Sequence, residues 1–211
     1  MLELNITHFS VYLHLFDLLG TFAFAVTGAL KGIEHKFDIV GVIFLSSITG
    51  LAGGIFRDIV LGKDIPIGIT DPVYLIVTTS TGFIVFFLYR IIKNYLSIFL
   101  IFDAIGLGVF SIIGSTLAYF IFGENYLIML FSGIITAVGG GILRDITVRE
   151  KPVVFVKELY ITSSFLGISI FFIMIYLEIN LELASIISIL VITLTRIITM
   201  KLDLNLPKAK I

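Results

Sequence analysis

The chain has 211 residues, of which 58% are hydrophobic and 14% charged, with a formal net charge of -1. Soluble domains carry about half apolar and about a quarter charged residues, so this balance indicates an integral membrane protein. The near-zero charge argues against a nucleic-acid partner, and the lack of cysteine excludes disulfides, thiolate metal sites and cysteine nucleophiles.

Seven apolar runs are each close to the roughly 20 residues that a helix needs to cross a bilayer core. They do not alternate apolar and polar residues with a period of two, so helices are expected rather than strands. We predict an all-α membrane protein whose residues 1–211 form a single integral membrane domain. The predicted spans are 9–30, 38–61, 73–92, 95–122, 126–147, 159–177 and 181–199.

The basic residues are distributed unevenly between the two ends of these spans. One end has Lys63 alone, whereas the other carries eleven lysines and arginines. The positive-inside rule places the Lys63 end outside the cell, with the N-terminus outside and the C-terminus in the cytoplasm. The basic residues at the predicted cytoplasmic end are Lys31, Lys36, Arg90, Lys93, Arg149, Lys151, Lys157, Arg196, Lys201, Lys208 and Lys210. The eight tyrosines fall near the ends of the runs, as in an interfacial belt.

An internal repeat relates spans one to three to spans four to six. A unit of three spans crosses the membrane in the opposite sense the second time, so duplication produces an inverted repeat, which is typical of transporters and channels. We expect repeat one at about 9–92, repeat two at about 95–177, and an extra helix at about 181–199. The pairs that recur 86 residues apart are Asp17/Asp103, Gly20/Gly106, Phe24/Phe110, Gly28/Gly114, Pro66/Pro152 and Tyr74/Tyr160.

A Gly-Gly-Ile-x-Arg-Asp motif occurs in both the second and the fifth span. Its copies, Gly53 to Asp58 and Gly140 to Asp145, lie 87 residues apart. Glycine costs a helix interior about 1 kcal/mol relative to alanine, so each pair, extended to three by Gly139, predicts a kink or a break. A break in a membrane helix would offer carbonyl oxygens to a cation or a helix end to an anion.

Close helix packing through small residues is the alternative explanation of the glycines. Because the motif recurs at matching positions, we favour the break and expect the two glycine pairs to bracket a central cavity. Hydroxyl groups precede each pair, although a hydroxyl can also bond to its own helix. The candidate residues of an ion pathway are Gly53, Gly54, Gly139, Gly140, Gly141, Ser46, Thr49, Ser132 and Thr136.

Charged residues inside the spans form the second set of candidates. An arginine near the bilayer centre is expected to cost at least ~2.5 kcal/mol, so it faces a cavity or a partner, unless its side chain extends to the interface. We expect both to hold in part, with the two arginines lining vestibules at opposite faces. Each arginine could pair with its neighbouring aspartate or with an aspartate of the adjoining span. The candidates are Arg57, Asp58, Arg144, Asp145, Asp17 and Asp103.

Motifs for metal, phosphate or covalent chemistry are missing from the sequence. The three histidines have no metal-ligand spacing, and no Gly-Lys-Ser/Thr follows the glycine triplet. We therefore expect no enzyme, no metal and no cofactor. Two functions remain, a cation channel and a secondary transporter for a small zwitterion such as glycine, with a non-conducting membrane scaffold as a weaker third.

The spans, the repeat and the doubled motif together resemble the prokaryotic branch of the trimeric intracellular cation (TRIC) channels, also catalogued as a glycine-transporter-domain family. The resemblance covers about residues 9–199. It implies a multi-pass homotrimer in the cell membrane, with one pore in each subunit for K⁺ and Na⁺. It also implies that the glycine pairs lie on kinked, pore-lining helices, with the Arg-Asp pairs beside them.

Overall fold

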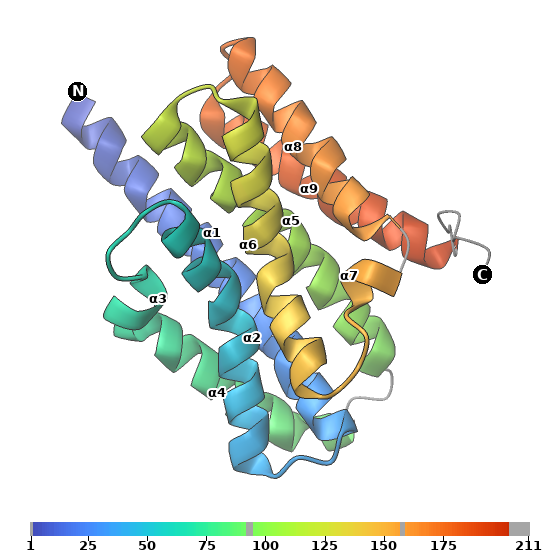
Figure 1. The fold of residues 1–211 in the computed structure, drawn as a ribbon. Helices are drawn as coiled ribbons and strands as arrows, with labels where there is room; N and C mark the ends of the chain where they lie inside the picture. The colour runs from blue at the N-terminus through green and yellow to red at the C-terminus, as the bar shows by residue number, and fades with distance from the viewer. Residues whose placement is uncertain (1, 92–94, 157–158, 203–211) are drawn as a thin grey trace.

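The computed structural model describes residues 2–91, 95–156 and 159–202, which form a bundle of helices (Figure 1). Six helical segments in these ranges are long and apolar enough to cross a membrane, and one of them is α4 continued by the 3₁₀ turn η1 to Ile91. Helix α8, with 17 residues, is shorter. The described ranges therefore contain six candidate spans and one shorter apolar helix, and the predicted count of seven spans stays a prediction. The main helices of the bundle are α1 (Leu2–Glu34), α2 (Ile39–Val60), α4 (Pro72–Leu88), α5 (Tyr95–Phe122), α6 (Tyr126–Thr147), α8 (Tyr160–Tyr176) and α9 (Leu181–Lys201).

Polar caps explain why most of the boundaries were readable from the sequence. Asp38, Asp71, Asn125 and Asn180 precede α2, α4, α6 and α9, and each side chain accepts a backbone N–H from the first turn. Such side chains satisfy amides that have no partner inside the helix. The helix starts therefore follow from local chemistry.

Some helix boundaries differ from the prediction, and some short helices were not predicted. Helix α1 begins at Leu2, earlier than predicted, and the sequence did not indicate the short helices α3 (Ile67–Thr70) and α7 (Val153–Val156) or the 3₁₀ turn η1 (Tyr89–Ile91). Lys93, Lys157, Lys208 and Lys210 lie outside the described residues. The direction in which the chain crosses the membrane stays a prediction.

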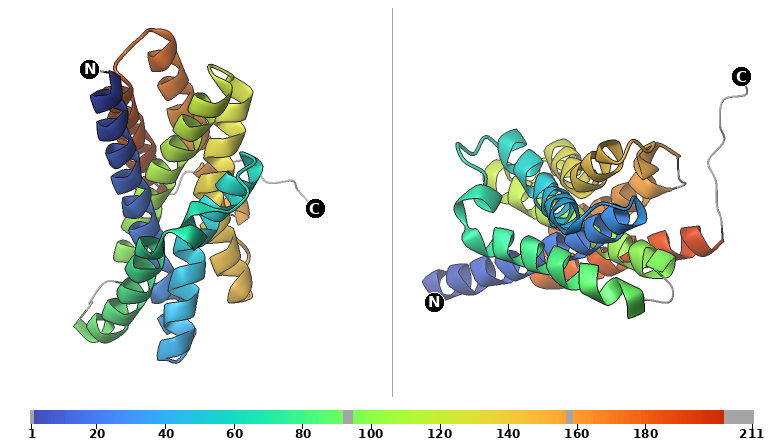
Figure 2. Two further views of the ribbon diagram at one scale, coloured as in Figure 1. Left: turned by 90° about the vertical axis from the view of Figure 1, so that its left-hand side faces the viewer. Right: turned by 90° about the horizontal axis from the view of Figure 1, so that it is seen from below.

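Four helices occupy the middle of the bundle. Helix α1 packs against α2 and α5, and α6 packs against α5 and α2. Helix α4 covers α1 and α2 on one side, while α8 and α9 cover α5 on the other, as the two views in Figure 2 show. The central helices therefore come from both repeats.

Reciprocal contacts join the two repeats across this centre. The rings of Phe24 and Phe110 are fully buried, with centroids 5.3 Å apart. A Cβ atom added to Gly20 would lie 2.5 Å from the Phe110 ring, and one added to Gly106 would lie 3.1 Å from the Phe24 ring. Each glycine therefore makes room for the phenylalanine of the other repeat. This reciprocity explains why the glycine-phenylalanine spacing occurs twice.

The doubled glycine motif lies where α2 and α6 cross, and it does not break either helix. Both helices are continuous over Ile39–Val60 and Tyr126–Thr147. A Cβ atom on Gly53 would collide with the carbonyl oxygen of Thr136, and one on Gly140 would collide with that of Thr49. The predicted break is therefore wrong for this structure, because the glycines permit close approach of two continuous helices. The alternative, a glycine kink, stays a prediction.

The expectation that the glycine pairs bracket a central cavity is also wrong. A Cβ atom built on Gly139 would lie 3.5 Å from the Cα atom of Gly53, so the two copies meet at one point. The physical reason is that helices without side chains at their crossing gain van der Waals contact along their backbones. This gain offsets the low helix propensity of glycine.

Adjacent glycines in α6 should respond oppositely to alanine. We expect Gly140→Ala to lower the free energy of unfolding by about 2 kcal/mol, as an overpacked contact does. Gly141→Ala should be neutral or stabilising by up to about 1 kcal/mol, because the nearest atoms to its added Cβ lie 3.6 and 3.8 Å away. Thermal unfolding of both variants in one detergent measures the difference, and equal midpoints would contradict the tight crossing.

Candidate functional site

Arg57 is the centre of the first charge cluster, which also contains Asp17, Asp58 and Tyr74. The Arg57 Nε donates to Asp58 Oδ1 at 2.9 Å, and Nη1 donates to Asp17 Oδ1 at 2.8 Å. The hydroxyl of Tyr74 donates to the other oxygen of Asp17 at 2.9 Å. Arg57 therefore joins α2 to α1, and the hydrogen bond of Tyr74 joins α4 to the same aspartate of α1.

The second charge cluster repeats this arrangement around Arg144, with Asp103, Asp145 and Thr27. The Arg144 Nε donates to Asp145 Oδ1 at 2.8 Å, and Nη1 lies 3.0 Å from Asp103 Oδ1. The same Nη1 donates to the Thr27 hydroxyl at 2.9 Å. The sequence left open whether each arginine pairs with its neighbour or with the adjoining span, and the structure shows that it does both.

Each motif aspartate also caps a short helix. The second oxygen of Asp58 accepts the backbone N–H of Ile67 at 2.8 Å, at the start of α3. The second oxygen of Asp145 accepts that of Val153 at 2.9 Å, at the start of α7. A carboxylate held by a guanidinium on one side and an amide on the other is well compensated for its burial. This double role gives a reason for the adjacency of arginine and aspartate in the motif.

Burial corrects two expectations about these clusters. Arg57 and Arg144 are 1% and 0% exposed, so their side chains do not extend to the surface at all. Tyr74 and Tyr160 were assigned to an interfacial belt, but each is 3% exposed within a charge cluster or beside it. The separation of Tyr74 and Tyr160 by 86 residues was the signal that could have indicated their buried position. A tyrosine that only anchors a helix at the membrane interface does not need to occupy the same position in both repeats.

Phe99, Thr27 and Arg196, which lie around the second cluster, were not anticipated as candidates. The Arg144 guanidinium lies 4.7 Å from the centroid of the Phe99 ring, and that of Arg196 lies 4.6 Å from the Tyr160 ring. Thr27 is fully buried. Nothing in the local sequence marks these side chains, because their partners come from other helices.

The predicted pathway hydroxyls are fully buried and donate to backbone carbonyls of their own or a neighbouring helix. Thr49 donates to Leu45 and Thr136 to Ser132, each at 2.6 Å. Ser132 also donates to Gly114 at 2.9 Å, and Ser46 Oγ lies 2.9 Å from two carbonyl oxygens of α1 and α4. In this state Ser46 and Ser132 tie helices together, whereas Thr49 and Thr136 bond within their own helices. A role of these hydroxyls in conduction stays a prediction.

Gly54 and Gly141 are placed differently from the other motif glycines. A Cβ atom on either would lie 3.6 Å from the Nη2 atom of Arg57 or Arg144. These two glycines therefore leave room for the buried guanidinium groups. The motif divides into Gly53 and Gly140 at the crossing and Gly54 and Gly141 beside the arginines.

A vestibule of about 250 Å³ opens beside the first cluster. Its walls combine charged and apolar side chains from both repeats: Leu13, His14, Asp17, Arg57, Lys63, Ile67, Tyr74, Ile113 and Leu117. Lys63 Nζ lies 3.4 Å from Asp58 Oδ1. The vestibule thus contains two cations and, at Asp17, a carboxylate.

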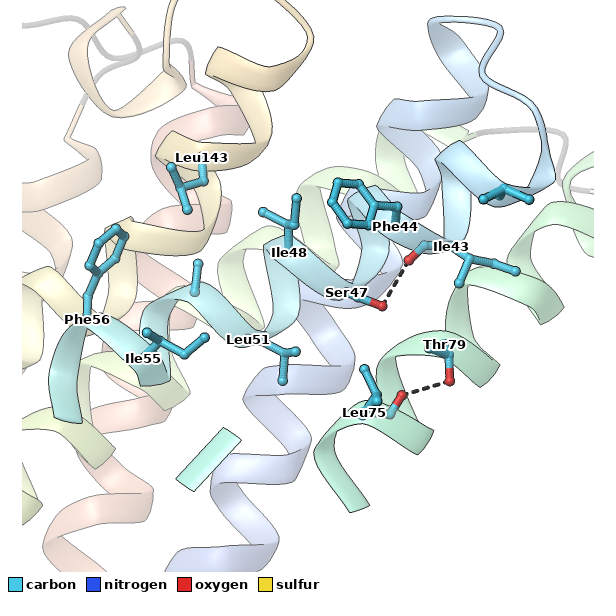
Figure 3. Close-up of a pocket in the computed structure, with 12 residues that line it drawn as sticks. Ile43, Phe44, Ser47, Ile48, Leu51, Ile55, Phe56, Leu75, Thr79 and Leu143 are labelled. Atoms are coloured by element: carbon cyan, nitrogen blue, oxygen red, sulfur yellow. Dashed lines mark hydrogen bonds between the residues drawn. The ribbon is translucent and has the colours of Figure 1, made fainter. Parts of the chain in front are cut away.

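An apolar groove of about 550 Å³ lies on another face, between α2 and α4 with Leu143 of α6 at its edge (Figure 3). Its two hydroxyl groups are directed to their own helices: Ser47 donates to Ile43 at 2.9 Å and Thr79 to Leu75 at 2.7 Å. A groove with no available polar group suits hydrocarbon and offers nothing to an ion. We therefore place the candidate site at the charge clusters and the crossing between them.

Comparison with known proteins gives consistent matches over most of the chain. A glycine transporter family model matches twice, over residues 14–90 and 100–176. An inner membrane protein of Escherichia coli strain K12, YadS, is 34% identical over 193 residues, which are 90% of this chain and 93% of that protein. A membrane protein of Vibrio cholerae is 40% identical over 156 residues, 74% of this chain and 65% of its own.

Solved structures agree with the fold as well. A prokaryotic TRIC channel in 0.5 M KCl is 33% identical with a TM-score of 0.87, over 93% of this chain and 100% of its own. A TRIC orthologue from Rhodobacter sphaeroides is 32% identical with a TM-score of 0.87, over 92% and 99%. A structure that addresses conductance through TRIC cation channels is 37% identical with a TM-score of 0.84, over 94% and 97%. With the inner-membrane relative and the six apolar helices, these matches make the chain a multi-pass cell membrane protein.

Removal of one carboxylate from the second cluster should destabilise the protein. We expect Asp103→Asn to lower the free energy of unfolding by about 3 kcal/mol, because a buried guanidinium then lacks one of its charged partners. Asp64→Asn, at an exposed loop position, is the matched control and should stay near wild type. Thermal unfolding in detergent measures both, and equal stability would mean that the ion pair contributes little.

Proposed function

This chain belongs to the glycine transporter family, which includes the prokaryotic TRIC channels, and we propose that it conducts monovalent cations, K⁺ and Na⁺, through a path within each subunit. The observation that carries the proposal is the likeness to three solved TRIC structures, at 32–37% identity and over 92–94% of the chain. The proposal needs only the permeant ion and no cofactor.

The proposed path runs between α1, α2, α5 and α6, from one charge cluster to the other. In the described state it is closed at the glycine crossing, so conduction requires α2 and α6 to separate there. Separation would uncover the carbonyl oxygens of Thr49 and Thr136 beside Gly140 and Gly53. Carbonyl oxygens can replace part of the hydration shell of a cation. Glycine suits both states of the path. In the closed state it lets the two helices pack closely, and in the open state it leaves their backbone carbonyl groups accessible.

The charge clusters have a complementary role in this proposal. Asp17, Arg57 and Tyr74 tie α1, α2 and α4 together at one end, while Asp103 and Arg144 tie α5 to α6 at the other. Ion pairs of this kind would keep the ends of the helices in place while the crossing moves. Their carboxylates would also favour cations over anions at the two mouths.

The arrangement in the membrane completes the proposal. We propose a homotrimer in the lipid bilayer with the C-terminus in the cytoplasm, from the basic residues at that end and from the description of the structural relatives as trimeric channels. The apolar faces of the subunit are free to contact lipid or other subunits. Each subunit would carry its own path, because the clusters and the crossing lie inside one chain.

A secondary transporter for a small zwitterion such as glycine is the alternative. The vestibule beside Arg57 supports it, since a carboxylate could bind near Arg57 and Lys63 and an ammonium group near Asp17. A carrier of this kind would give saturable uptake and no unitary current.

Single-channel recording separates the two functions. We expect purified protein in planar bilayers with asymmetric KCl to show unitary currents whose reversal potential lies near that of K⁺, and similar currents after exchange for NaCl. Electrically silent bilayers, together with saturable counter-flow of labelled glycine into vesicles, would contradict the channel and support the carrier. Protein-free vesicles serve as the control for leak.

A further inference from the structure

Three charged or titratable side chains join the end of α1 to the turn that follows α6, at the same end of the bundle (Figure 1). Lys31 Nζ lies 2.9 Å from Glu150 Oε2, and His35 Nε2 lies 3.0 Å from Glu150 Oε1. Lys31 and His35 belong to the first repeat and Glu150 to the second. We call Lys31, His35 and Glu150 the latch, because their contacts connect the two repeats.

The imidazole ring of His35 faces a hydrogen-bond acceptor with each of its two nitrogens. Its Nδ1 lies 3.0 Å from the carbonyl oxygen of Lys31, and its Nε2 faces the carboxylate of Glu150. A neutral imidazole carries one N–H, whereas an imidazolium carries two. The ring can therefore donate to both partners at once only when it is protonated.

The positive charge that protonation adds to His35 has partners on both sides. His35 follows the last residue of α1, where the free carbonyl groups of a helix present partial negative charge. The ammonium of Lys31 is paired with Glu34 at 3.1 Å as well as with Glu150, which offsets its repulsion of an imidazolium. The charged residues around His35 are Lys31 and Glu34 of α1, Lys36 and Asp38 of the following turn, and Glu150 with its neighbours Arg149 and Lys151.

The repeat does not reproduce the latch at the opposite end of the bundle. Lys63 and Glu150 occupy equivalent positions, since each donates its backbone N–H to the carbonyl of its motif aspartate at 2.9 Å. Leu117 stands 86 residues after Lys31, and leucine and lysine cannot form an ion pair. Lys63 Nζ instead lies 3.4 Å from Asp58 of its own repeat. The pair that joins the repeats is therefore specific to the end where α1 finishes.

We propose that the latch is controlled by a proton on His35: the protonated ring ties the end of α6 to α1, and loss of the proton weakens the tie. The consequence for conduction rests on the proposed path, because that path needs α6 to separate from α2 and α1 packs against α2. Histidine is the side chain whose charge changes between pH 5 and pH 8. The path is therefore held shut at acidic pH and released at alkaline pH.

The distance between two spin labels tests the latch without relying on current. The chain has no cysteine of its own, so Lys36→Cys and Thr147→Cys, at exposed positions, place one label after α1 and one at the end of α6. We expect the population with the longer distance to rise about fivefold from pH 5.5 to pH 8, as loss of a weak ion pair implies. His35→Gln keeps an N–H donor but has no titrating proton, so it should remove the pH dependence. Equal distance distributions at the two pH values with His35 present would overturn the latch.

Thermal stability gives a second measurement whose sign is fixed by the chemistry. The contact of protonated His35 with Glu150 stabilises the fold at acidic pH, and this contribution is lost as the pH rises through the imidazole range. A double-mutant cycle of His35→Gln and Glu150→Gln should therefore show a coupling of about 2–4 °C in the unfolding midpoint at pH 5.5 and a coupling close to zero at pH 8. The matched control pairs His35→Gln with Glu124→Gln, at an exposed position between α5 and α6, and should show no coupling. The same coupling at both pH values for His35 and Glu150 would contradict control by the proton.

Single-channel recording connects the latch to conduction. The open probability of the wild type should be about fivefold higher at pH 8 than at pH 5.5 when the pH is changed on the side of His35, and that of His35→Gln should not depend on pH. A conducting wild type whose open probability ignores pH would overturn the regulatory role. Silent bilayers, together with pH-dependent distances and coupling, would refute the proposed channel and leave the latch standing, so the two failures are distinguishable.

Discussion

The burial of one arginine in each repeat is the constraint on which the rest of the molecule depends. A guanidinium inside a membrane helix is tolerated where carboxylates and hydrogen-bond acceptors surround it. Arg57 and Arg144 meet this requirement by taking one aspartate from their own helix and one from the helix before it. Because the second oxygen of each motif aspartate caps a short helix, the same ion pairs also determine where the chain turns after α2 and α6.

The middle of the bundle follows a different principle. There the repeats meet through glycine, with α2 and α6 in backbone contact at Gly53, Gly139 and Gly140. Van der Waals contact holds this crossing, between the two backbones and with the rings of Phe56 and Phe110 beside Gly139 and Gly53. Ion pairs hold the helices together at both ends of the subunit, whereas α2 and α6 meet at the centre through glycine. Helices α2 and α6 could therefore shift against each other at the crossing while the ion pairs keep the fold. The path proposed above, which would open at the crossing, depends on that contrast.

Departures from the repeat carry as much information as the repeat itself. Most paired positions serve the same structural purpose, as Phe24 and Phe110 do. Where the pairs differ in chemistry, as Leu13 and Phe99 do, the two ends of the bundle acquire different properties.

The sequence by itself determined the helical class, most helix boundaries and the two charged sites. Hydrophobic length and the spacing of 86–87 residues are local or periodic signals, so they can be read without knowledge of the fold. Tertiary structure alone decided that the glycine pairs pack instead of breaking, since a pair reads identically in both cases. It also decided that Tyr74 and Tyr160 are buried, and that Thr27 and Phe99 hold Arg144. The partners of these residues lie on other helices, so no pattern along the chain could specify them.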